Sequence, residues 1–280
     1  MISSPDKVLF PADGITKREL AEYYQLVAPQ LLPHLRMRPV TMERFPSGID
    51  KKGFIQKDVS KGFPAWLERV EVPKQGGTVH HPLINDARAL EWMANQNCIT
   101  PHVWNRRAPD LYHPDLCVFD LDPMRDEVDV VRAAALAVRE LLGELGLESW
   151  VKTTGSKGFH IVVPLDGGAD VEAVSAFAHR VGAELVRRRP RELTQEFSKA
   201  DRGGRIYVDT GRNGYSATFA APYAVRPRAG APVSAPCSWD ELARGAVAPQ
   251  TFTLRNLTAR LAEVGDLWGD LYQRPAALPR

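Results

Sequence analysis

Residues 116–122, LCVFDLD, form a short apolar run that ends in two aspartates. Such a run, bounded by Pro123, predicts a buried β-strand. Side chains two residues apart point to the same face of a strand, so Asp120 and Asp122 lie side by side. Neighbouring carboxylates repel each other, and a divalent cation relieves that repulsion because it prefers oxygen ligands. The pattern predicts a metal-binding strand end, with a plain solvated strand end as the alternative.

The segments that follow this strand predict an α/β core. Asp126 is placed to cap a helix whose apolar residues recur at helical spacing over 128–145. The strands SWVKTT and FHIVVPL follow, then a helix that Asp170 caps and that stops at Pro190, then the strand RIYVDT. This order of strand, helix, hairpin, helix and strand predicts an α/β (or α+β) fold with a mixed central sheet and flanking helices.

The ends of the chain show weaker patterns. Thr16 and Glu19 make a capping box that predicts a helix over 16–32, and β-like runs between 39 and 81 predict a small antiparallel sheet. Asn85 is placed to cap the next helix. Ser238 begins a second capping box after the loop 227–236, PRAGAPVSAP. We therefore expect one domain over 1–280, with an N-terminal lobe (1–85), a catalytic core (86–230) and a C-terminal helical segment (231–280).

The composition bounds the classes of protein that the chain can belong to. It has 36 basic and 34 acidic side chains, so a nucleic-acid binder of this kind must place its positive charge locally. The three cysteines are an odd number and widely spaced, which favours a reducing compartment over a disulfide framework. The sequence shows no signal-peptide pattern and no apolar run of roughly 18 residues, so we expect a cytoplasmic protein without membrane contact.

A second group of polar residues surrounds the turn between the two middle strands. In residues 153–160, TTGSKGFH, two glycines flank Ser156 and Lys157, with Thr154 before them and His160 after them. Backbone N–H groups in such a turn, together with hydroxyl, ammonium and imidazole groups, suit phosphate oxygens. The alternative is a plain glycine hairpin in which His160 is an ordinary strand residue.

A third carboxylate ends the strand RIYVD. Asp209 shares a strand face with Tyr207 and Arg205, and a carboxylate from a second strand is what a two-metal phosphoryl-transfer site needs. The alternative is a turn aspartate before Gly211. The three motifs in this order are far more specific than any one of them.

With these motifs the chain resembles the polymerase domain of bacterial ligase D, within the archaeo-eukaryotic primase superfamily. The resemblance runs from DKVLFPADGITKRELAEYY through RFPSGID, CVFDLDP, TTGSKGFHIVVPL and YVDTGRNGYSATFAAPYAVR to CSWDEL. It implies a primase-polymerase fold in a stand-alone form. It also implies template-directed transfer of nucleotides, with a preference for ribonucleotides, onto a DNA 3′-hydroxyl at gaps and broken ends.

The resemblance also implies a role for individual residues. It implies two divalent ions, Mn²⁺ or Mg²⁺, on the aspartates, and an incoming nucleoside triphosphate on the turn residues. It further implies gapped or broken DNA as substrate, end-joining proteins as partners and a location at the nucleoid. The implied ligands are Asp120, Asp122 and Asp209 for metal; Thr154, Ser156, Lys157, His160, Arg226 and His102 for the nucleotide; Lys7 and Lys17 for the DNA 5′-phosphate; and Phe54 and Lys57 for the template.

Two of these positions can also be judged from the residues alone. Lys17 would be the first residue of a capped helix, where its ammonium adds to the free N–H groups and the helix dipole, and a solvated lysine is the alternative. Phe54 stands alone after Gly53, where the family usually has two adjacent aromatics. After Asp209 the chain lacks a lysine that is common in the family, and Arg212 can substitute for it.

Other functions remain open at this point. A non-catalytic DNA-end binder would use Lys7, Lys17 and Phe54 alone, but it gains nothing from clustered carboxylates near phosphate. A metal-dependent nuclease would use the carboxylates, but the turn at 153–160 suits a triphosphate. The pairs Cys98 with His102 and His113 with Cys117 have zinc-ligand spacing, with buried core thiols as the alternative. The arginines at 187–189 and 191 are a solvated helix end or a phosphate track.

Overall fold

One sheet is built around β8 (Leu116–Asp122), the strand that ends in the two aspartates. The computed structural model describes residues 2–59 and 62–279. β8 pairs antiparallel with β10 (Phe159–Pro164) on one side and with β12 (Ile206–Asp209) on the other. The strand order is β11-β12-β8-β10-β9-β16, in which only the pair β11 and β12 is parallel. The predicted mixed sheet is therefore confirmed. The outer strands are β9 (Trp150–Thr153), β11 (Leu193–Thr194) and β16 (Pro236–Cys237).

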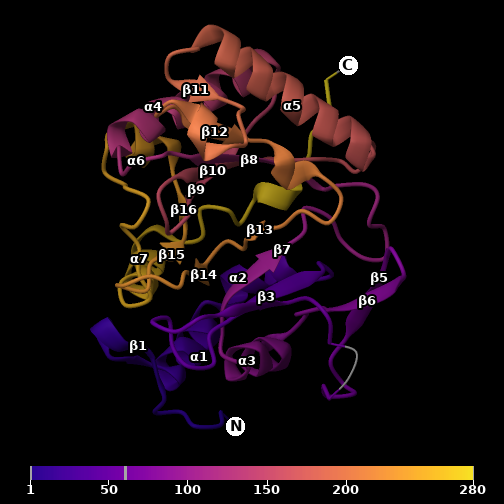
Figure 1. The fold of residues 1–280 in the computed structure, drawn as a ribbon, viewed down its shortest axis with the longest axis vertical. Coiled ribbons are helices and arrows are strands. Elements are labelled where there is room, and N and C mark those ends of the chain that lie inside the picture. Colours follow the sequence, from indigo (N-terminus) through magenta and orange to yellow (C-terminus); the bar gives the residue numbers. More distant parts are fainter. Residues whose placement is uncertain (1, 60–61, 280) are drawn as a thin grey trace. The chain divides into compact units, whose positions relative to one another are not determined.

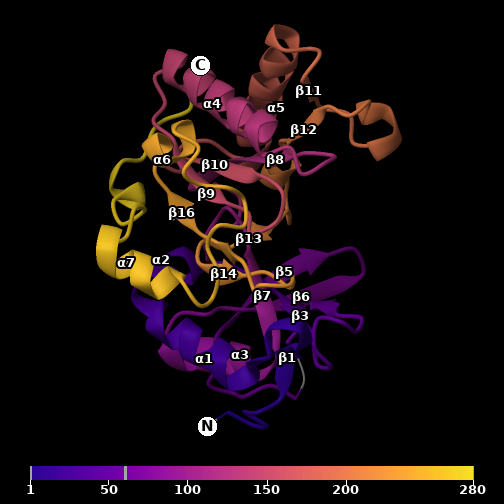
Figure 2. The ribbon, with the colours of Figure 1, turned by 90° about the vertical axis from the view of Figure 1, so that its left-hand side faces the viewer.

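Two long helices pack against this sheet and against each other. α4 (Val128–Glu144) and α5 (Val171–Arg188) both contact β8 and lie side by side in Figures 1 and 2. The Asp170 side chain accepts a hydrogen bond from the Ala173 N–H at 2.8 Å, so this predicted cap is confirmed. The predicted cap by Asp126 is wrong, because α4 has no side-chain cap and the Asp126 carboxylate pairs with the Lys157 ammonium at 3.3 Å.

A second sheet contains two of the four strands predicted in the N-terminal part, β3 and β4, so the prediction of one small sheet is only partly confirmed. Its order is β13-β7-β3-β4, and every pair is antiparallel. The hairpin of β5 and β6 forms a sheet of its own. The sequence did not indicate β7, because Pro101 within it argues against a central strand. The strands are β3 (Val40–Arg44), β4 (Phe54–Gln56), β5 (Arg69–Lys74), β6 (Gly77–Pro82), β7 (Cys98–Val103) and β13 (Phe219–Ala220).

The first helix is shorter than predicted. Two helices, α1 (Lys17–Leu26) and α2 (Ala28–Leu35), replace the single helix expected over 16–32. Pro29 lies in the first turn of α2, where its missing N–H is tolerated, whereas inside a longer helix it would break a hydrogen bond. The capping box is confirmed, since Thr16 N–H donates to the Glu19 carboxylate at 2.8 Å and Glu19 N–H to the Thr16 hydroxyl at 3.3 Å.

The next helix, α3 (Ala87–Asn95), begins one residue later than predicted. Asp86 caps it by accepting a hydrogen bond from Ala89 N–H at 2.8 Å. The adjacent Asn85 instead accepts a hydrogen bond from the backbone N–H of Met37 at 2.8 Å. The prediction that Asn85 is the cap is therefore wrong, because its side chain is engaged by a distant segment.

The C-terminal part is mixed rather than purely helical. The predicted box at Ser238 is confirmed, with Ser238 and Glu241 exchanging hydrogen bonds at 2.8 and 3.1 Å. The predicted loop 227–236 contains β15 and the first residue of β16. The remaining elements are β1 (Val8–Phe10), β2 (Ile15–Thr16), β14 (Ala224–Val225), β15 (Val233–Ser234), α6 (Trp239–Ala243), α7 (Leu257–Val264), η1 (Pro11–Asp13), η2 (Lys199–Arg202), η3 (Gly211–Asn213) and η4 (Leu271–Gln273).

The chain divides into two compact units. Unit 1 comprises Met1–Asp110, Thr218–Ser234 and Phe252–Gly265, and unit 2 comprises Leu111–Ala217, Ala235–Thr251 and Asp266–Arg280. The expected segments 1–85, 86–230 and 231–280 of one domain stay a prediction, because the units group residues by contact and not by function. Among the described residues, none of the helices is both long and apolar enough to cross a membrane.

Candidate active site

The three predicted aspartates of unit 2 lie at the ends of two paired strands. In the antiparallel register of β8 and β12, Asp209 lies opposite Asp120, and Tyr207 lies opposite Asp122. Asp120 is buried, whereas the Asp122 side chain is 45% exposed. The pairing of the two strands therefore places Asp209 opposite Asp120, which is 89 residues earlier in the chain.

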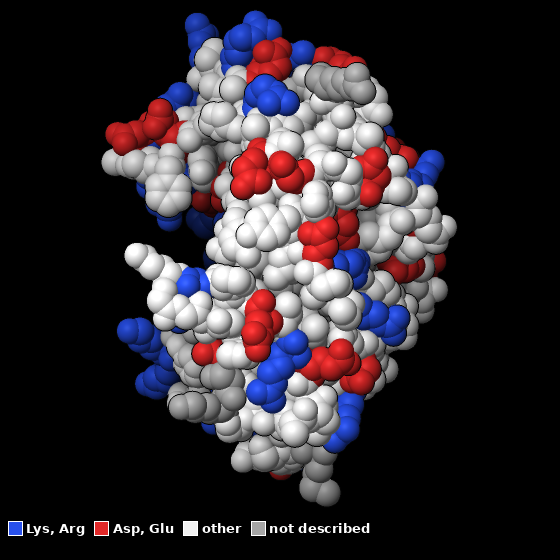
Figure 3. All heavy atoms as spheres, turned by 90° about the vertical axis from the view of Figure 1, so that its right-hand side faces the viewer, with Lys and Arg blue, Asp and Glu red and all other residues white. Residues whose placement is uncertain are grey.

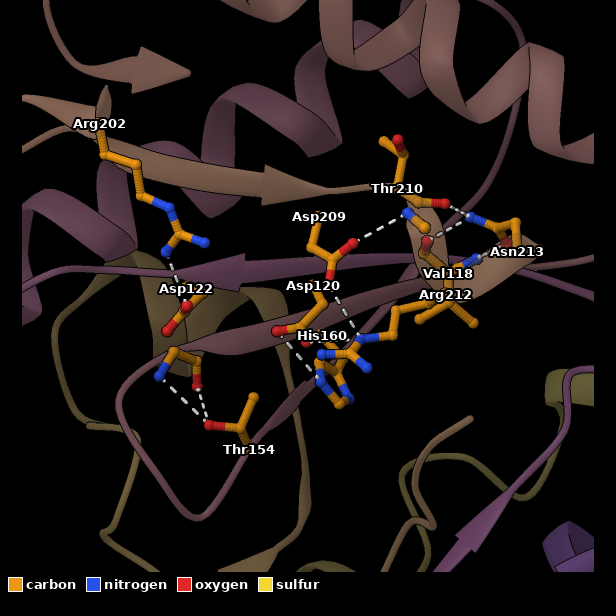
Figure 4. A network of polar contacts seen from close by, with 12 residues as sticks. Val118, Asp120, Asp122, Thr154, His160, Arg202, Asp209, Thr210, Arg212 and Asn213 are labelled. Carbon is orange, nitrogen blue, oxygen red and sulfur yellow. Dashed lines mark hydrogen bonds and ion pairs between the residues drawn. The ribbon is translucent and has the colours of Figure 1, made fainter. Parts of the chain in front are cut away.

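Each of these carboxylates has an arginine partner (Figure 4). The Arg212 Nε atom lies 3.0 Å from Asp120 Oδ2 and 3.1 Å from Asp209 Oδ2. The Arg202 Nη1 atom lies 2.9 Å from Asp122 Oδ2. Sequence reasoning missed Arg202, although a basic residue in the glycine-rich loop before β12 was the available signal. The carboxylates thus have cationic partners within the protein.

Asp120 also contacts the histidine of the next strand. His160 lies opposite Asp120 in the register of β8 and β10, and its Nε2 lies 3.3 Å from Asp120 Oδ1. Burial favours the neutral carboxyl, but His160 and Arg212 outweigh it and hold the pKa of Asp120 below its usual range. Burial and the Lys152 ammonium lower the pKa of His160 to about 4. A neutral imidazole N–H therefore donates to an ionised Asp120.

The pKa of Asp209, which faces Asp120, shifts in the opposite direction. Burial raises the pKa of Asp209, Arg212 opposes that shift, and the neighbouring Asp120 charge adds to it. Gly211 N–H donates to Asp209 Oδ1 at 2.9 Å, which favours the ionised form. Opposite shifts in two facing carboxylates are the result expected when like charges share one site.

The chemistry of this donor set suits a divalent metal ion. Asp120 and Asp209 already converge on one cationic nitrogen, and carboxylate oxygens are the ligands that Mg²⁺ and Mn²⁺ prefer. Within residues 2–59 and 62–279, no group of three or more His, Cys, Asp or Glu side chains is arranged so that it could hold a metal ion. Arginine side chains, rather than further carboxylates, complete the cluster.

The turn between β9 and β10 is tied together by its own threonine. The Thr154 hydroxyl lies 3.1 Å from Ser156 N and 3.2 Å from Gly158 N, and both N–H groups donate to it. These two N–H groups are therefore occupied within the turn, which corrects the expectation that they point outward to phosphate. Thr154 is buried, and Lys157 pairs with Asp126. Ser156 and Lys157 remain the partly exposed polar side chains of this turn.

The other two predicted nucleotide ligands, His102 and Arg226, belong to unit 1. His102 lies on β7, and its Nε2 is 3.0 Å from the Glu43 carboxylate of β3. Burial raises the pKa of Glu43, but the hydrogen bond from His102 and the charges of His102 and Arg226 together lower it below the usual value. Glu43 was missed by sequence reasoning. The structure thus brings His102, Glu43 and Arg226 into one electrostatic cluster.

Lys17 is buried, so the alternative of a solvated lysine is wrong. Its ammonium donates to the Ser3 carbonyl oxygen at 2.8 Å and to the Ser3 hydroxyl at 3.1 Å. Burial, Lys7 and Arg44 all lower the pKa of Lys17. Lys7 is close in the backbone as well, because Lys17 N–H donates to the Lys7 carbonyl at 2.8 Å. Sequence reasoning missed Arg44, the third cation of this group.

The predicted template residues lie on and beside β4. The Phe54 side chain is 46% exposed, and the Arg44 guanidinium carbon lies 5.2 Å from its ring centroid. Lys57 is exposed just after the strand. A Cβ atom on Gly53 would lie 2.6 Å from the Phe45 ring, so a second aromatic has no room there. This contact explains why the chain has a single aromatic at this point.

The surface charge does not test the expectation of a local concentration of positive charge. On the face shown in Figure 3, Lys and Arg side chains are interspersed with Asp and Glu side chains. Arg187 and Arg188 pair with Glu184, each at 2.7 Å, and Arg188 also pairs with Glu144 at 2.7 Å. These contacts favour the solvated helix end over a phosphate track.

The zinc alternative finds no support. Cys98 and Cys117 are fully buried, and burial raises the pKa of both thiols far above the usual value. Zinc binds the thiolate, which such burial disfavours. His102 is engaged by Glu43. The buried core thiol is thus the better interpretation for both cysteines.

The comparisons with known proteins agree with the resemblance inferred from the motifs. The family model "LigD, primase-polymerase domain" matches residues 16–268. A multifunctional non-homologous end joining protein LigD of Mycolicibacterium smegmatis is 37% identical over 276 residues, which cover 96% of this chain and 36% of that protein. LigD of Pseudomonas aeruginosa is 36% identical, over 96% of this chain and 32% of that protein.

A solved structure gives the same result. The polymerase domain of Mycobacterium tuberculosis ligase D, in complex with DNA, matches with a TM-score of 0.92 at 34% identity, over 99% of both chains. The present chain spans about a third of the length of the curated relatives named above. The predicted fold and the predicted class of enzyme, a DNA nucleotidyltransferase that depends on divalent metal, are confirmed at the level of the family. The chain belongs to the family of LigD primase-polymerase domains.

Proposed function

We propose that this chain is a template-directed nucleotidyltransferase that extends DNA 3′ ends and fills gaps during the repair of broken DNA. The observation that carries the proposal is the register of β8 and β12, in which Asp209 faces Asp120 with Asp122 at the same strand end. A shift of one residue in the pairing of β12 with β8 would turn Asp209 to the opposite face of the sheet from Asp120. A polymerase acting on chromosomal breaks would work at the nucleoid, in line with the cytoplasmic location expected from the sequence.

Asp120, Asp122 and Asp209 would hold two divalent ions, with Mn²⁺ preferred over Mg²⁺. When bound, such ions lower the pKa of the attacking hydroxyl and neutralise charge on the departing pyrophosphate. The protein fixes the carboxylates on paired strands, and His160 orients Asp120 through its hydrogen bond. This preorganisation is the part of catalysis that the chain itself supplies.

Each unit contains polar side chains that are proposed, unit by unit, as ligands of a nucleoside triphosphate. In unit 2, Ser156 and Lys157 offer a hydroxyl and an ammonium on a turn whose shape Thr154 maintains, and His160 follows on β10. In unit 1, the proposed ligands are His102 and Arg226. Cationic and hydroxyl groups of this kind stabilise the negative charge of phosphate oxygens.

DNA would be bound by residues of unit 1. Lys17 and Lys7 would bind the 5′-phosphate at a gap or break, and Arg44 would add a third positive charge to that pocket. Phe54 would stack on a template base and Lys57 would contact the template backbone, as aromatic and basic residues do in proteins that bind single strands. End-joining proteins are the proposed partners, because the relatives are end-joining proteins.

One assay separates this proposal from the two alternatives. A gapped duplex with a labelled primer is incubated with ribo- or deoxynucleoside triphosphates and with Mn²⁺ or Mg²⁺. Extension of the primer, greatest with ribonucleotides and Mn²⁺, supports the polymerase. Shortening of the primer would identify a nuclease, and a shifted but unchanged primer would identify a DNA-end binder.

A further inference from the structure

Arg212 is a positively charged partner that the facing carboxylates of β8 and β12 share. The Arg212 Nε atom lies within 3.0 Å of Asp120 and 3.1 Å of Asp209, so one guanidinium bridges the two side chains. The carboxylates are largely enclosed, at 13% and 15% exposure, whereas the Arg212 side chain is 39% exposed. Figure 4 shows Arg212 lying beside Asp120 and Asp209.

The backbone that carries Arg212 is held in place from both sides. The next residue, Asn213, accepts a hydrogen bond from Val118 N–H at 2.8 Å and donates to the Val118 carbonyl at 2.7 Å. On the other side, Gly211 N–H donates to Asp209 at 2.9 Å. These bonds fix η3 to β8 and β12, so the long Arg212 side chain can leave the carboxylates without any movement of the sheet.

A divalent ion held by Asp120 and Asp209 would need carboxylate oxygens that the Arg212 guanidinium contacts in the structure. Two enclosed carboxylates without a cation repel each other, so the pair requires a positive partner. Arg212 supplies that partner in the structure. It must leave Asp120 and Asp209 before their oxygens can coordinate a divalent ion, and a guanidinium that leaves one anion is stabilised by meeting another.

We propose that Arg212 is the exchangeable counterion of the Asp120–Asp209 pair, and that it makes the binding of a divalent ion depend on an accompanying polyphosphate. This inference rests on the proposed function, since it takes the two aspartates as metal ligands. A metal ion alone has to displace Arg212 from the two carboxylates without bringing another anion to it. A metal ion that arrives with a triphosphate brings the planar, forked guanidinium an anion that it can bind through two parallel hydrogen bonds.

Binding of Mn²⁺ provides a test that does not depend on activity. Isothermal titration calorimetry and electron paramagnetic resonance would give Kd values for Mn²⁺ alone and for the preformed complex of Mn²⁺ with tripolyphosphate. Arg212→Gln removes the competing charge and is expected to bind Mn²⁺ alone about 5- to 150-fold more tightly than the unaltered chain, the usual range of coupling between two sites. The same variant is expected to bind the Mn²⁺–tripolyphosphate complex more weakly.

The control is Arg187→Gln, the same substitution on an arginine that is 72% exposed and pairs with Glu184 on α5. It should leave both Kd values unchanged. Arg212→Lys keeps the positive charge but loses the two parallel N–H donors of the guanidinium. Its Kd for Mn²⁺ alone should therefore lie between the values of the unaltered chain and of Arg212→Gln. This variant serves as the test if thermal unfolding shows that Arg212→Gln does not fold.

The outcomes separate this inference from the proposed function. Equal Mn²⁺ affinity in Arg212→Gln and the unaltered chain, with loss of binding in Asp209→Asn, would overturn the counterion role and leave the metal site intact. Tighter binding of both Mn²⁺ and its tripolyphosphate complex by Arg212→Gln would overturn the dependence on polyphosphate. If Asp120→Asn and Asp209→Asn both bind Mn²⁺ as the unaltered chain does, the metal site itself is wrong, and the proposal about Arg212 falls with it.

Discussion

Gly158 packs directly on the backbone of Leu121. A Cβ atom at position 158 would lie 1.7 Å from the Leu121 carbonyl oxygen and 3.4 Å from the Pro123 ring. Only glycine can approach a backbone so closely. The turn that carries Ser156 and Lys157 is therefore held against the strand end that carries Asp120 and Asp122.

We expect Gly158→Ala to destabilise the protein by about 3 kcal/mol, the upper end of the cost of overpacking, since the clash is with backbone. Gly143→Ala is the matched control, because Gly143 lies within helix α4 and a Cβ atom there would have nothing within 4 Å. That control should stabilise the protein by about 0.5–1 kcal/mol. Urea unfolding monitored by circular dichroism measures both. Equal stability of the two variants would show that the turn is not packed on β8.

Each of the substitutions Asp120→Asn, Asp122→Asn and Asp209→Asn should lower the rate of primer extension by ~10²–10³ or more. The reason is that each removes a charge that would act on the transition state, whereas the proposed DNA contacts of Lys17 and Phe54 lie in unit 1. DNA affinity, measured by fluorescence anisotropy with a gapped duplex, should stay within a few-fold. Extension at the unaltered rate in any one variant would remove that aspartate from the metal site.

His160→Ala and Arg226→Ala should weaken the use of the incoming nucleotide more than the binding of DNA. Arg226 is proposed to stabilise the triphosphate, where negative charge develops as pyrophosphate leaves. His160, whose N–H donates to Asp120, would act on the nucleotide through the position of that carboxylate. Steady-state kinetics in nucleotide concentration, at saturating DNA, would measure the effect as kcat/KM. The opposite pattern, in which kcat/KM is unchanged and DNA affinity falls, would assign these residues to the DNA instead.

Lys17→Met should remove the preference for a gap that has a 5′-phosphate over one that has a 5′-hydroxyl. A phosphate at the start of α1 gains a charge-assisted hydrogen bond and the field of the helix N-terminus, together worth about 1–3 kcal/mol, or ~5- to 150-fold in Kd. Lys7→Met should share the loss, so the double variant should lose more. Competition binding with the two gap ends measures the preference.

Ser3→Ala is the control for this prediction. Lys17 donates to the Ser3 hydroxyl as well as to its carbonyl, so Ser3→Ala loosens the local structure but keeps the ammonium. It should keep the preference for the phosphorylated end. If the unaltered chain shows no such preference, the phosphate pocket is wrong, even where primer extension is observed.

The sequence predicted those elements whose signals are local. The capping boxes at Thr16 and Ser238 and the cap at Asp170 depend on residues three positions apart, and the structure confirms all three. The cap at α3 was misplaced because Asn85 and Asp86 are adjacent candidates, and only a contact with the distant Met37 decides between them. Strand β7 was missed because tertiary pairing with β3 overrides the local effect of Pro101.

The same limit applies to the candidate site. Alternation along β8 was enough to place Asp120 and Asp122 on one face, and alternation along RIYVD pointed to Asp209 as a third carboxylate. The family resemblance implied the metal-binding role of all three. The pairing of Arg202 with Asp122 and of Arg212 with Asp120 could not be predicted, since the partners are 80 and 92 residues apart in the chain. Arg212 was named only as a substitute for a family lysine, although Asp209 lies three residues before it. The burial of Lys17 likewise depends on its bonds to Ser3, which a helix pattern does not reveal.

Each of the two units is assembled from three separate stretches of the chain, which restricts how the protein can be dissected. A fragment that ended at Asp110 would lack β13, the edge partner of β7 in the unit 1 sheet. The N–H and C=O groups of β7 would then be unpaired along one side, and such an open strand edge recruits strands of other molecules. Fragments cut at position 110 should therefore aggregate. The unit 1 sheet is complete only when the chain extends through β13, and the unit 2 sheet only when it extends through β16.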